Sequence, residues 1–210
     1  ILIEETNGIY MLMGILAAIG SIVTVYCTSM IYASLKAIPA WTLPLVPPLY
    51  ICLSMTTGSV ILITLLRAFG SEILGLSIFC LLILLITMFL KIKYWKMLDV
   101  MPANSNIESA TGLGGIGKVH VLEKPHTSEN YLQQEMGFQI ARKHSEKLRK
   151  IVLISLFILP IIFITLTFLI PNIAFTLTLI AIAPATIGIS IERWLFFAEA
   201  KHVVMSYYEG

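Results

Sequence analysis

The sequence predicts an all-α fold, a polytopic bundle of five transmembrane helices, and three observations support this prediction. Of the 210 residues, 58% are hydrophobic and only 12% are charged, and the mean hydropathy is +0.90. Five long stretches contain no Asp, Glu, Lys, Arg or His, and ten of the 14 Lys and Arg residues lie in one polar segment, 91–150. Because soluble domains are about one-quarter charged, this composition excludes an ordinary soluble enzyme.

The charge-free stretches define the expected helices. A helix that crosses about 30 Å of hydrocarbon needs about 20 apolar residues, and a segment in lipid must satisfy its own backbone hydrogen bonds, which favours helices over open strands. In chain order, the expected spans are Ile9–Ala33, Leu43–Leu66, Ile73–Leu90, Ile151–Ile170 and Ile173–Ile191. The third span is only just long enough.

Prolines support these boundaries. Four of them crowd the start of the second span, where a missing backbone N–H is tolerated (Pro39, Pro44, Pro47 and Pro48). The short turn at Pro171-Asn172 makes the last two spans an antiparallel hairpin. Pro160 and Pro184 lie within spans and predict kinks.

Lys and Arg residues are distributed unevenly between the two sides that five spans define. One side has 13 of the 14, and the other has only Arg67. The positive-inside rule then predicts that 91–150 and the C-terminus face the cytoplasm. The expected organisation is three helices over 1–93, a basic polar loop over 94–150, and a hairpin with an interfacial C-terminal helix over 151–210. Within the loop, apolar residues spaced four apart predict an amphipathic helix over Ser128–Lys150.

The sequence disfavours three kinds of cofactor site. Gly112–Gly117 matches G-x-G-x-x-G, but no buried strand is expected before it, as a dinucleotide site requires. The cysteines are scattered singly, without the spacing of an iron–sulfur site (Cys27, Cys52 and Cys80). All four histidines lie outside the expected spans, so we expect no haem between them.

Two groups of residues at the ends of spans are candidates for a quinone site. Tyr32, Lys36 and Trp41 combine aromatic rings with a cation near the end of the first span. Such residues commonly form an interfacial aromatic belt. The alternative is a quinone pocket, in which donors hold the carbonyl oxygens and rings flank the headgroup.

The second group follows the last span. If the helix continues one or two turns beyond its charge-free stretch, Glu192 and Arg193 lie within the membrane, where charges are normally paired or functional. Glu199 would share the helix face of Glu192, and Glu192 could accept a proton from quinol. The alternative is an interfacial helix end with Arg193 reaching towards water. His202 fits either a quinone headgroup site or an ordinary surface position.

Three segments resemble the membrane-anchor subunit of the bacterial dimethyl sulfoxide reductase family: Thr28–Trp41, Pro125–Phe138 and Glu192–Val204. The resemblance covers essentially the whole chain, and the last segment, with the sequence ERWLFFAEAKHVV, is the most specific. Anchors of this family usually have eight helices, so this chain would correspond to helices four to eight.

The resemblance implies a bacterial inner-membrane complex of three subunits for anaerobic electron transport. An iron–sulfur subunit and a molybdopterin catalytic subunit would dock on this non-catalytic anchor, which would carry no haem or cluster of its own and would exchange electrons with menaquinone or ubiquinone. Related anchors serve sulfite dehydrogenases, in which electrons run from sulfite to quinone. Two rival interpretations are a secondary transporter and a purely structural tether.

Overall fold

A computed structural model describes residues 8–71, 74–101, 108, 111–120 and 142–203. The long elements are α-helices, and the described residues contain no strand. In chain order they are α1 (Gly8–Ala33), α2 (Val46–Ala68), α3 (Leu74–Asp99), α7 (Ser145–Val152), η1 (Leu153–Ile158), α8 (Leu159–Leu169), η2 (Pro171–Ile173) and α9 (Ala174–Ala198). Five helical segments are long and apolar enough to cross a membrane, which confirms the predicted fold class.

Three of the five helical segments extend well beyond their charge-free stretches. α3 continues nine residues past Leu90, the fourth segment already begins at Ser145, and α9 continues to Ala198. The division of the chain at residues 93 and 150 stays a prediction, although α3 runs past the first of these boundaries. Of the amphipathic helix predicted over Ser128–Lys150, residues 128–141 lie outside the described part, and 145–150 are helical and lead directly into the fourth segment.

The two prolines expected to kink helices have different outcomes. The six residues of η1, just before Pro160, have π-helical hydrogen bonding. Proline has no N–H to donate and its ring crowds the preceding turn, and a π segment accommodates both effects. α9 remains α-helical through Pro184.

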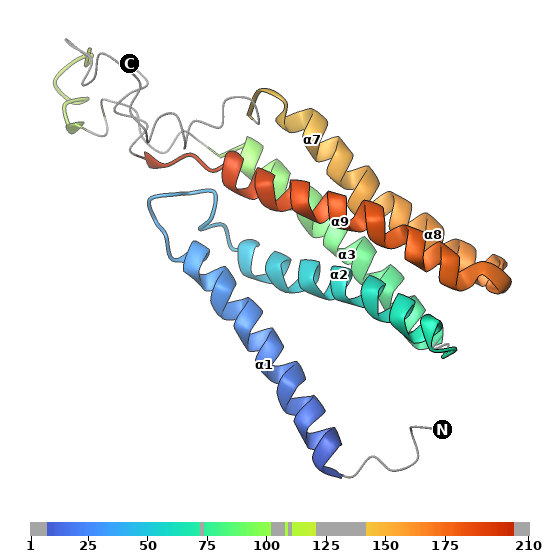
Figure 1. Cartoon of the computed structure of the whole chain (residues 1–210). Coiled ribbons are helices and arrows are strands. Elements are labelled where there is room, and N and C mark those ends of the chain that lie inside the picture. Colours follow the sequence, from blue (N-terminus) through green and yellow to red (C-terminus); the bar gives the residue numbers. More distant parts are fainter. Residues whose placement is uncertain (1–7, 72–73, 102–107, 109–110, 121–141, 204–210) are drawn as a thin grey trace, which may run out of the picture.

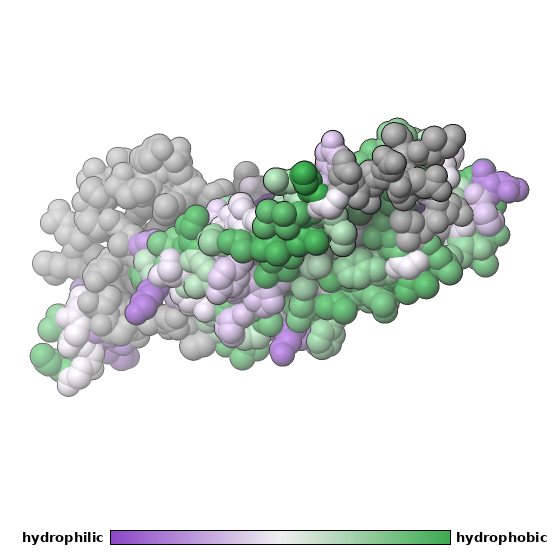
Figure 2. Space-filling model, turned by 90° about the horizontal axis from the view of Figure 1, so that it is seen from below, coloured by the Kyte–Doolittle hydropathy of each residue, from purple (hydrophilic) through white to green (hydrophobic). Residues whose placement is uncertain are grey.

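The helices pack as a bundle from which α1 diverges (Figure 1). α9 is the central helix, since it packs against α2, α7, η1 and α8, and α2 also packs against α3. α1 meets α2 near its C-terminal end and then separates from it, so that Ser29 is its only buried residue. On the face shown in Figure 2, hydrophobic side chains cover most of the described bundle, as expected for a surface that contacts lipid.

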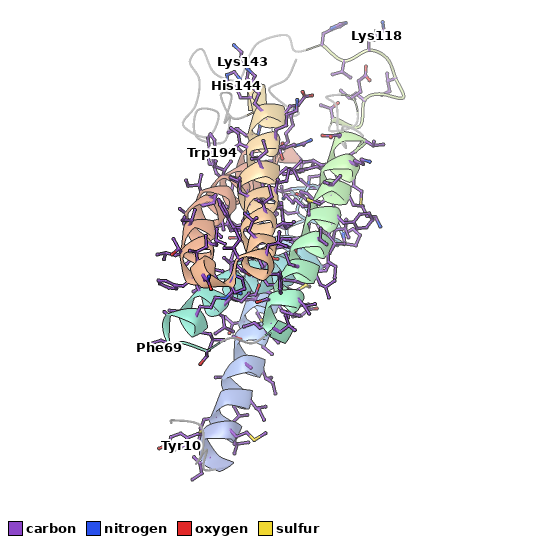
Figure 3. The ribbon with its side chains drawn as sticks, turned by 90° about the vertical axis from the view of Figure 1, so that its right-hand side faces the viewer. Tyr10, Phe69, Lys118, Lys143, His144 and Trp194 are labelled. Atoms are coloured by element: carbon purple, nitrogen blue, oxygen red, sulfur yellow. The ribbon has the colours of Figure 1, made fainter. Side chains whose placement is uncertain are left out.

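Buried polar side chains join the helices at several levels. The hydroxyls of Thr56 in α2 and Thr87 in α3 are 2.8 Å apart, and Arg67 donates a hydrogen bond of 3.0 Å to Thr167 in α8. Such hydrogen bonds help to hold helices together where lipid removes the usual hydrophobic driving force. Arg67 lies near Phe69, whereas Lys118, Lys143 and His144 mark the opposite end of the molecule (Figure 3). We call that opposite end, where α3 and α9 finish and α7 begins, the polar end.

Candidate functional site

Two oppositely charged side chains meet inside the bundle near the polar end. Lys91 of α3 donates a hydrogen bond to Glu192 of α9, and their side chains are 1% and 0% exposed. Removing two charges from water is costly unless each is paired and hydrogen-bonded, so each residue requires the other. The pair joins two helices that are far apart in the sequence.

Arg193 is the second partner of Glu192. Its Nε donates to the other carboxylate oxygen, so Glu192 lies between two cations. The Arg193 guanidinium carbon lies 4.4 Å from the ring centre of Tyr50 and 5.0 Å from that of Phe196. Lys91 makes equivalent contacts with Tyr94 and Trp95, at 4.5 and 5.0 Å. Aromatic faces thus stabilise both cations where water cannot.

Five aromatic rings from three parts of the chain lie beside Arg193, and we call them the aromatic cluster: Tyr32, Trp41, Tyr50, Phe196 and Phe197. Tyr32 is in contact with all four others, with ring centres 5.1–5.7 Å apart. These distances are typical of stacked and edge-to-face pairs. The cluster joins the end of α1 and the start of α2 to the last turn of α9.

The connection between α1 and α2 folds over the end of α9. Trp41 donates a hydrogen bond of 3.0 Å from Nε1 to the carbonyl of Phe196, one of the last four carbonyls of α9, which have no partner within the helix. Arg142 donates to the carbonyl of Ala198 at 2.9 Å. The backbone N–H of Val203 donates to Ala37 at 2.9 Å, and Tyr94 donates to Ala40 at 3.3 Å.

Replacing Trp41 by Phe should keep most of the ring packing while it removes the donor to Phe196. A buried carbonyl that loses its partner costs about 1–3 kcal/mol, so we expect the purified protein to unfold at lower temperature. Thermal unfolding in detergent measures this. Thr42→Val is a suitable control, because the Thr42 hydroxyl bonds only locally, to Pro39, and is exposed. An equal loss in both variants would contradict the argument.

A second set of ion pairs lies beside the first, closer to the polar end. Arg149 of α7 donates to both carboxylate oxygens of Asp99 and, through Nε, to Glu199, all at 2.8 Å. The Glu199 side chain is 8% exposed, and burial raises its pKa against the opposing effect of Arg149. The ring of Trp95 lies between the two sets, 5.5 Å from the Arg149 guanidinium carbon and 5.0 Å from Lys91 Nζ.

The structure brings together four of the six residues that the sequence suggested: Tyr32, Trp41, Glu192 and Arg193. Lys36 is exposed in the connection after α1, and His202 is half-buried beyond α9. The expectation that helix ends account for Glu192 and Arg193 is corrected, since α9 continues past both.

Sequence reasoning missed the central cation, Lys91, together with Tyr50, Trp95 and Arg149. One signal was available for two of them. Lys91, Tyr94, Trp95 and Leu98 are spaced as one face of a helix, whereas Lys93 and Lys96 occupy the opposite face and are exposed. Among the described residues, no group of three or more His, Cys, Asp or Glu side chains could hold a metal ion.

Comparison with known proteins identifies a distant relative. The chain is 25% identical over 203 residues to the C subunit of the sulfite dehydrogenase of Allochromatium vinosum. The similarity covers 95% of this chain and 61% of that protein, so the chain spans about three-fifths of the relative's length. No family model matches, and no solved structure matches. The chain is thus a multi-span membrane protein with distant homology to the membrane-anchor component of a sulfite dehydrogenase.

Proposed function

We propose that the chain is the membrane anchor of a bacterial sulfite dehydrogenase-type complex and that it delivers electrons to quinone. The observation that carries this proposal is the similarity to the sulfite dehydrogenase relative over nearly the whole chain. The partners would be an iron–sulfur subunit and a molybdopterin catalytic subunit. A dehydrogenase removes electrons from its substrate, so this relative favours quinone reduction over the quinol oxidation of a dimethyl sulfoxide reductase.

The aromatic cluster and Arg193 have the chemistry that a quinone headgroup needs. The flat ring would pack against Tyr32 and Tyr50, whose rings stack at 5.7 Å, and the Arg193 side chain, 29% exposed, offers donors to a carbonyl oxygen. The Trp41 N–H is already bonded to Phe196, so Trp41 would contribute its ring. Glu192 would hold Arg193 in place, and Lys36 and His202 would lie at the rim.

The polar end would be the docking surface for the partner subunits. It carries exposed cations from two helices, Lys96 of α3 and Lys147 and Lys150 of α7. Their field would attract an acidic partner at low salt. By the positive-inside rule, this end would face the cytoplasm of the inner membrane.

The two rival functions differ from this proposal in measurable ways. A secondary transporter also uses charged groups within its helices, as Lys91 and Glu192 are here. A structural tether would hold the catalytic subunits without contacting quinone. Only the proposed anchor both co-purifies with molybdenum and non-haem iron and reduces quinone.

The test is sulfite-dependent reduction of a soluble quinone analogue by the complex purified from native membranes. Arg193→Gln should raise the KM for quinone about tenfold or more, because a hydrogen bond to a charged donor contributes about 1.5–3 kcal/mol. Sulfite oxidation with ferricyanide as acceptor should not change. Lys93→Gln, at an exposed cation of α3, is the matched control.

Three results would contradict the proposal. Isolation of the chain without molybdenum and iron subunits would favour the transporter. A metal-containing complex that reduces ferricyanide but not quinone would indicate the tether. Equal KM values for Arg193→Gln and Lys93→Gln would exclude Arg193 from the headgroup site.

A further inference from the structure

We propose that Glu199, Lys91 and Glu192 form a proton-transfer path that runs from the polar end of the bundle to the aromatic cluster and supplies the protons for quinone reduction. This inference rests on the proposed function. It adds to that function a direction of proton uptake and an identified first residue, Glu199.

Contacts between charged groups extend continuously from the polar end into the bundle. Asp99 is 56% exposed, Arg149 is 15% exposed and Glu199 is 8% exposed, and Arg149 joins the two carboxylates. Lys91 and Glu192, further in, are fully buried. Arg193 then connects Glu192 to Tyr50 in the aromatic cluster.

Trp95 provides a second observation at the junction of the two sets. Its ring lies beside both Arg149 and Lys91, and its indole Nε1 is buried without a hydrogen-bond partner among the described residues. Buried N–H groups are nearly always bonded to protein or ordered water. A single water at this position would satisfy the indole and could bridge Glu199 and Lys91.

A purely structural role explains this arrangement less well. Well-packed apolar residues often stabilise a helix interface as much as a buried ion pair does. Ionisable groups inside membrane helices are therefore expected to have a function, and alternating acids and bases are typical of proton relays. Arg149 and Arg193 cannot release their protons, so they hold the carboxylates in place, and the carboxyls and the amine carry the proton.

Each transfer conserves charge. Lys91 gives a proton to Glu192, which passes it to a quinone oxygen at the cluster and becomes a carboxylate again. The neutral amine of Lys91 takes a proton from the Glu199 carboxyl, and Glu199 regains one from the water at the polar end. Two such cycles, with two electrons from the iron–sulfur subunit, convert one quinone into one quinol.

The experiment compares two activities of the intact complex that carries Glu199→Gln. Sulfite-dependent quinone reduction needs protons, whereas ferricyanide reduction does not. Because a positioned proton donor typically contributes about 10²–10⁴-fold, we expect quinone reduction to slow at least tenfold while the ferricyanide rate is retained. Asp99→Asn is the matched control, since it removes a carboxylate from the same guanidinium at an exposed position.

The pH profile separates proton transfer from a structural effect. Arg149 of α7 and Lys91 and Asp99 of α3 are the charged groups that face Glu199. Burial raises the pKa of Glu199, so the wild-type rate should fall as the pH rises through a value above the ordinary carboxyl range, where Glu199 loses its proton. Glu199→Gln should lack this inflection. Glu199→Asp, or formate added to Glu199→Ala, should restore a large part of the rate.

The outcomes distinguish this inference from the proposed function. If the wild-type complex does not reduce quinone, the proposed function fails, and the inference fails with it. If the wild type reduces quinone and Glu199→Gln does so at the same rate and with the same pH profile, only the proton path is wrong. If Glu199→Gln loses both activities and neither Asp nor formate restores quinone reduction, the role of Glu199 is structural and the inference is likewise overturned.

Discussion

Glu192→Leu should be among the most destabilising single substitutions in the bundle, at about 3–5 kcal/mol. Lys91, 1% exposed, would then remain among helices without its carboxylate partner. Its contacts with the rings of Tyr94 and Trp95 offset only part of that loss, because a cation over an aromatic face gains about 2 kcal/mol at best. We expect low recovery from the membrane and early thermal unfolding in detergent.

The reverse substitution should cost less. In Lys91→Met, Glu192 keeps its second cation, Arg193, so the carboxylate stays paired. The double variant Lys91→Met/Glu192→Leu should be more stable than Glu192→Leu alone, because similar-sized apolar side chains replace both charges. Unfolding temperatures of the four proteins give the coupling between the two residues. Additive effects would show that the pair contributes nothing beyond its separate side chains.

The double variant also separates stability from function. If the pair takes part only in packing, restoring stability should restore sulfite-dependent quinone reduction. If it carries protons, the double variant should fold and still reduce quinone slowly. The same four proteins thus test both the energetics of the pair and its proposed role.

The fold could be predicted from the sequence because it depends on a local property. Each span shows itself as a run of apolar residues, and hydrocarbon allows few structures other than a helix for such a run. The ends of α3 and α9 were misjudged because a charge was taken to mark the membrane boundary. Lys91 and Glu192 lie inside their helices because each neutralises the other, and that pairing depends on a contact across 101 positions of sequence.

The candidate site shows the same limit. Tyr32 and Trp41 are neighbours in sequence, so their grouping could be predicted, and the structure confirms their contact. Their packing against Phe196 and the bond from Trp41 to the end of α9 join residues 155 positions apart, which no local pattern specifies. The spacing of Lys91, Tyr94 and Trp95 was visible as a helix face, but nothing in it names Glu192 as the partner.

Gly188→Ala should be the second severe substitution, although it adds only one methyl group. An added Cβ at this position would lie 2.6 Å from the backbone nitrogen of Leu156 and 2.7 Å from Ser155 Oγ, distances that real Cβ atoms essentially never show. Since the closest atom is backbone, α9 and η1 would have to move apart. Overpacking typically costs about 1–3 kcal/mol, and a helix interface built on a small residue has little freedom to adjust.

Gly58→Ala is the matched control for this effect. Gly58 also lies inside a membrane helix, α2, but an added Cβ there meets nothing within 4 Å. Alanine favours helix over glycine by about 0.5–1 kcal/mol, so this variant should unfold at the same temperature as the wild type or slightly higher. The two variants should therefore move in opposite directions in thermal unfolding, and Gly188→Val should be worse than Gly188→Ala. If Gly188→Ala is as stable as Gly58→Ala, then α9 and η1 are not in close contact, and the central position of α9 in the bundle would need to be revised.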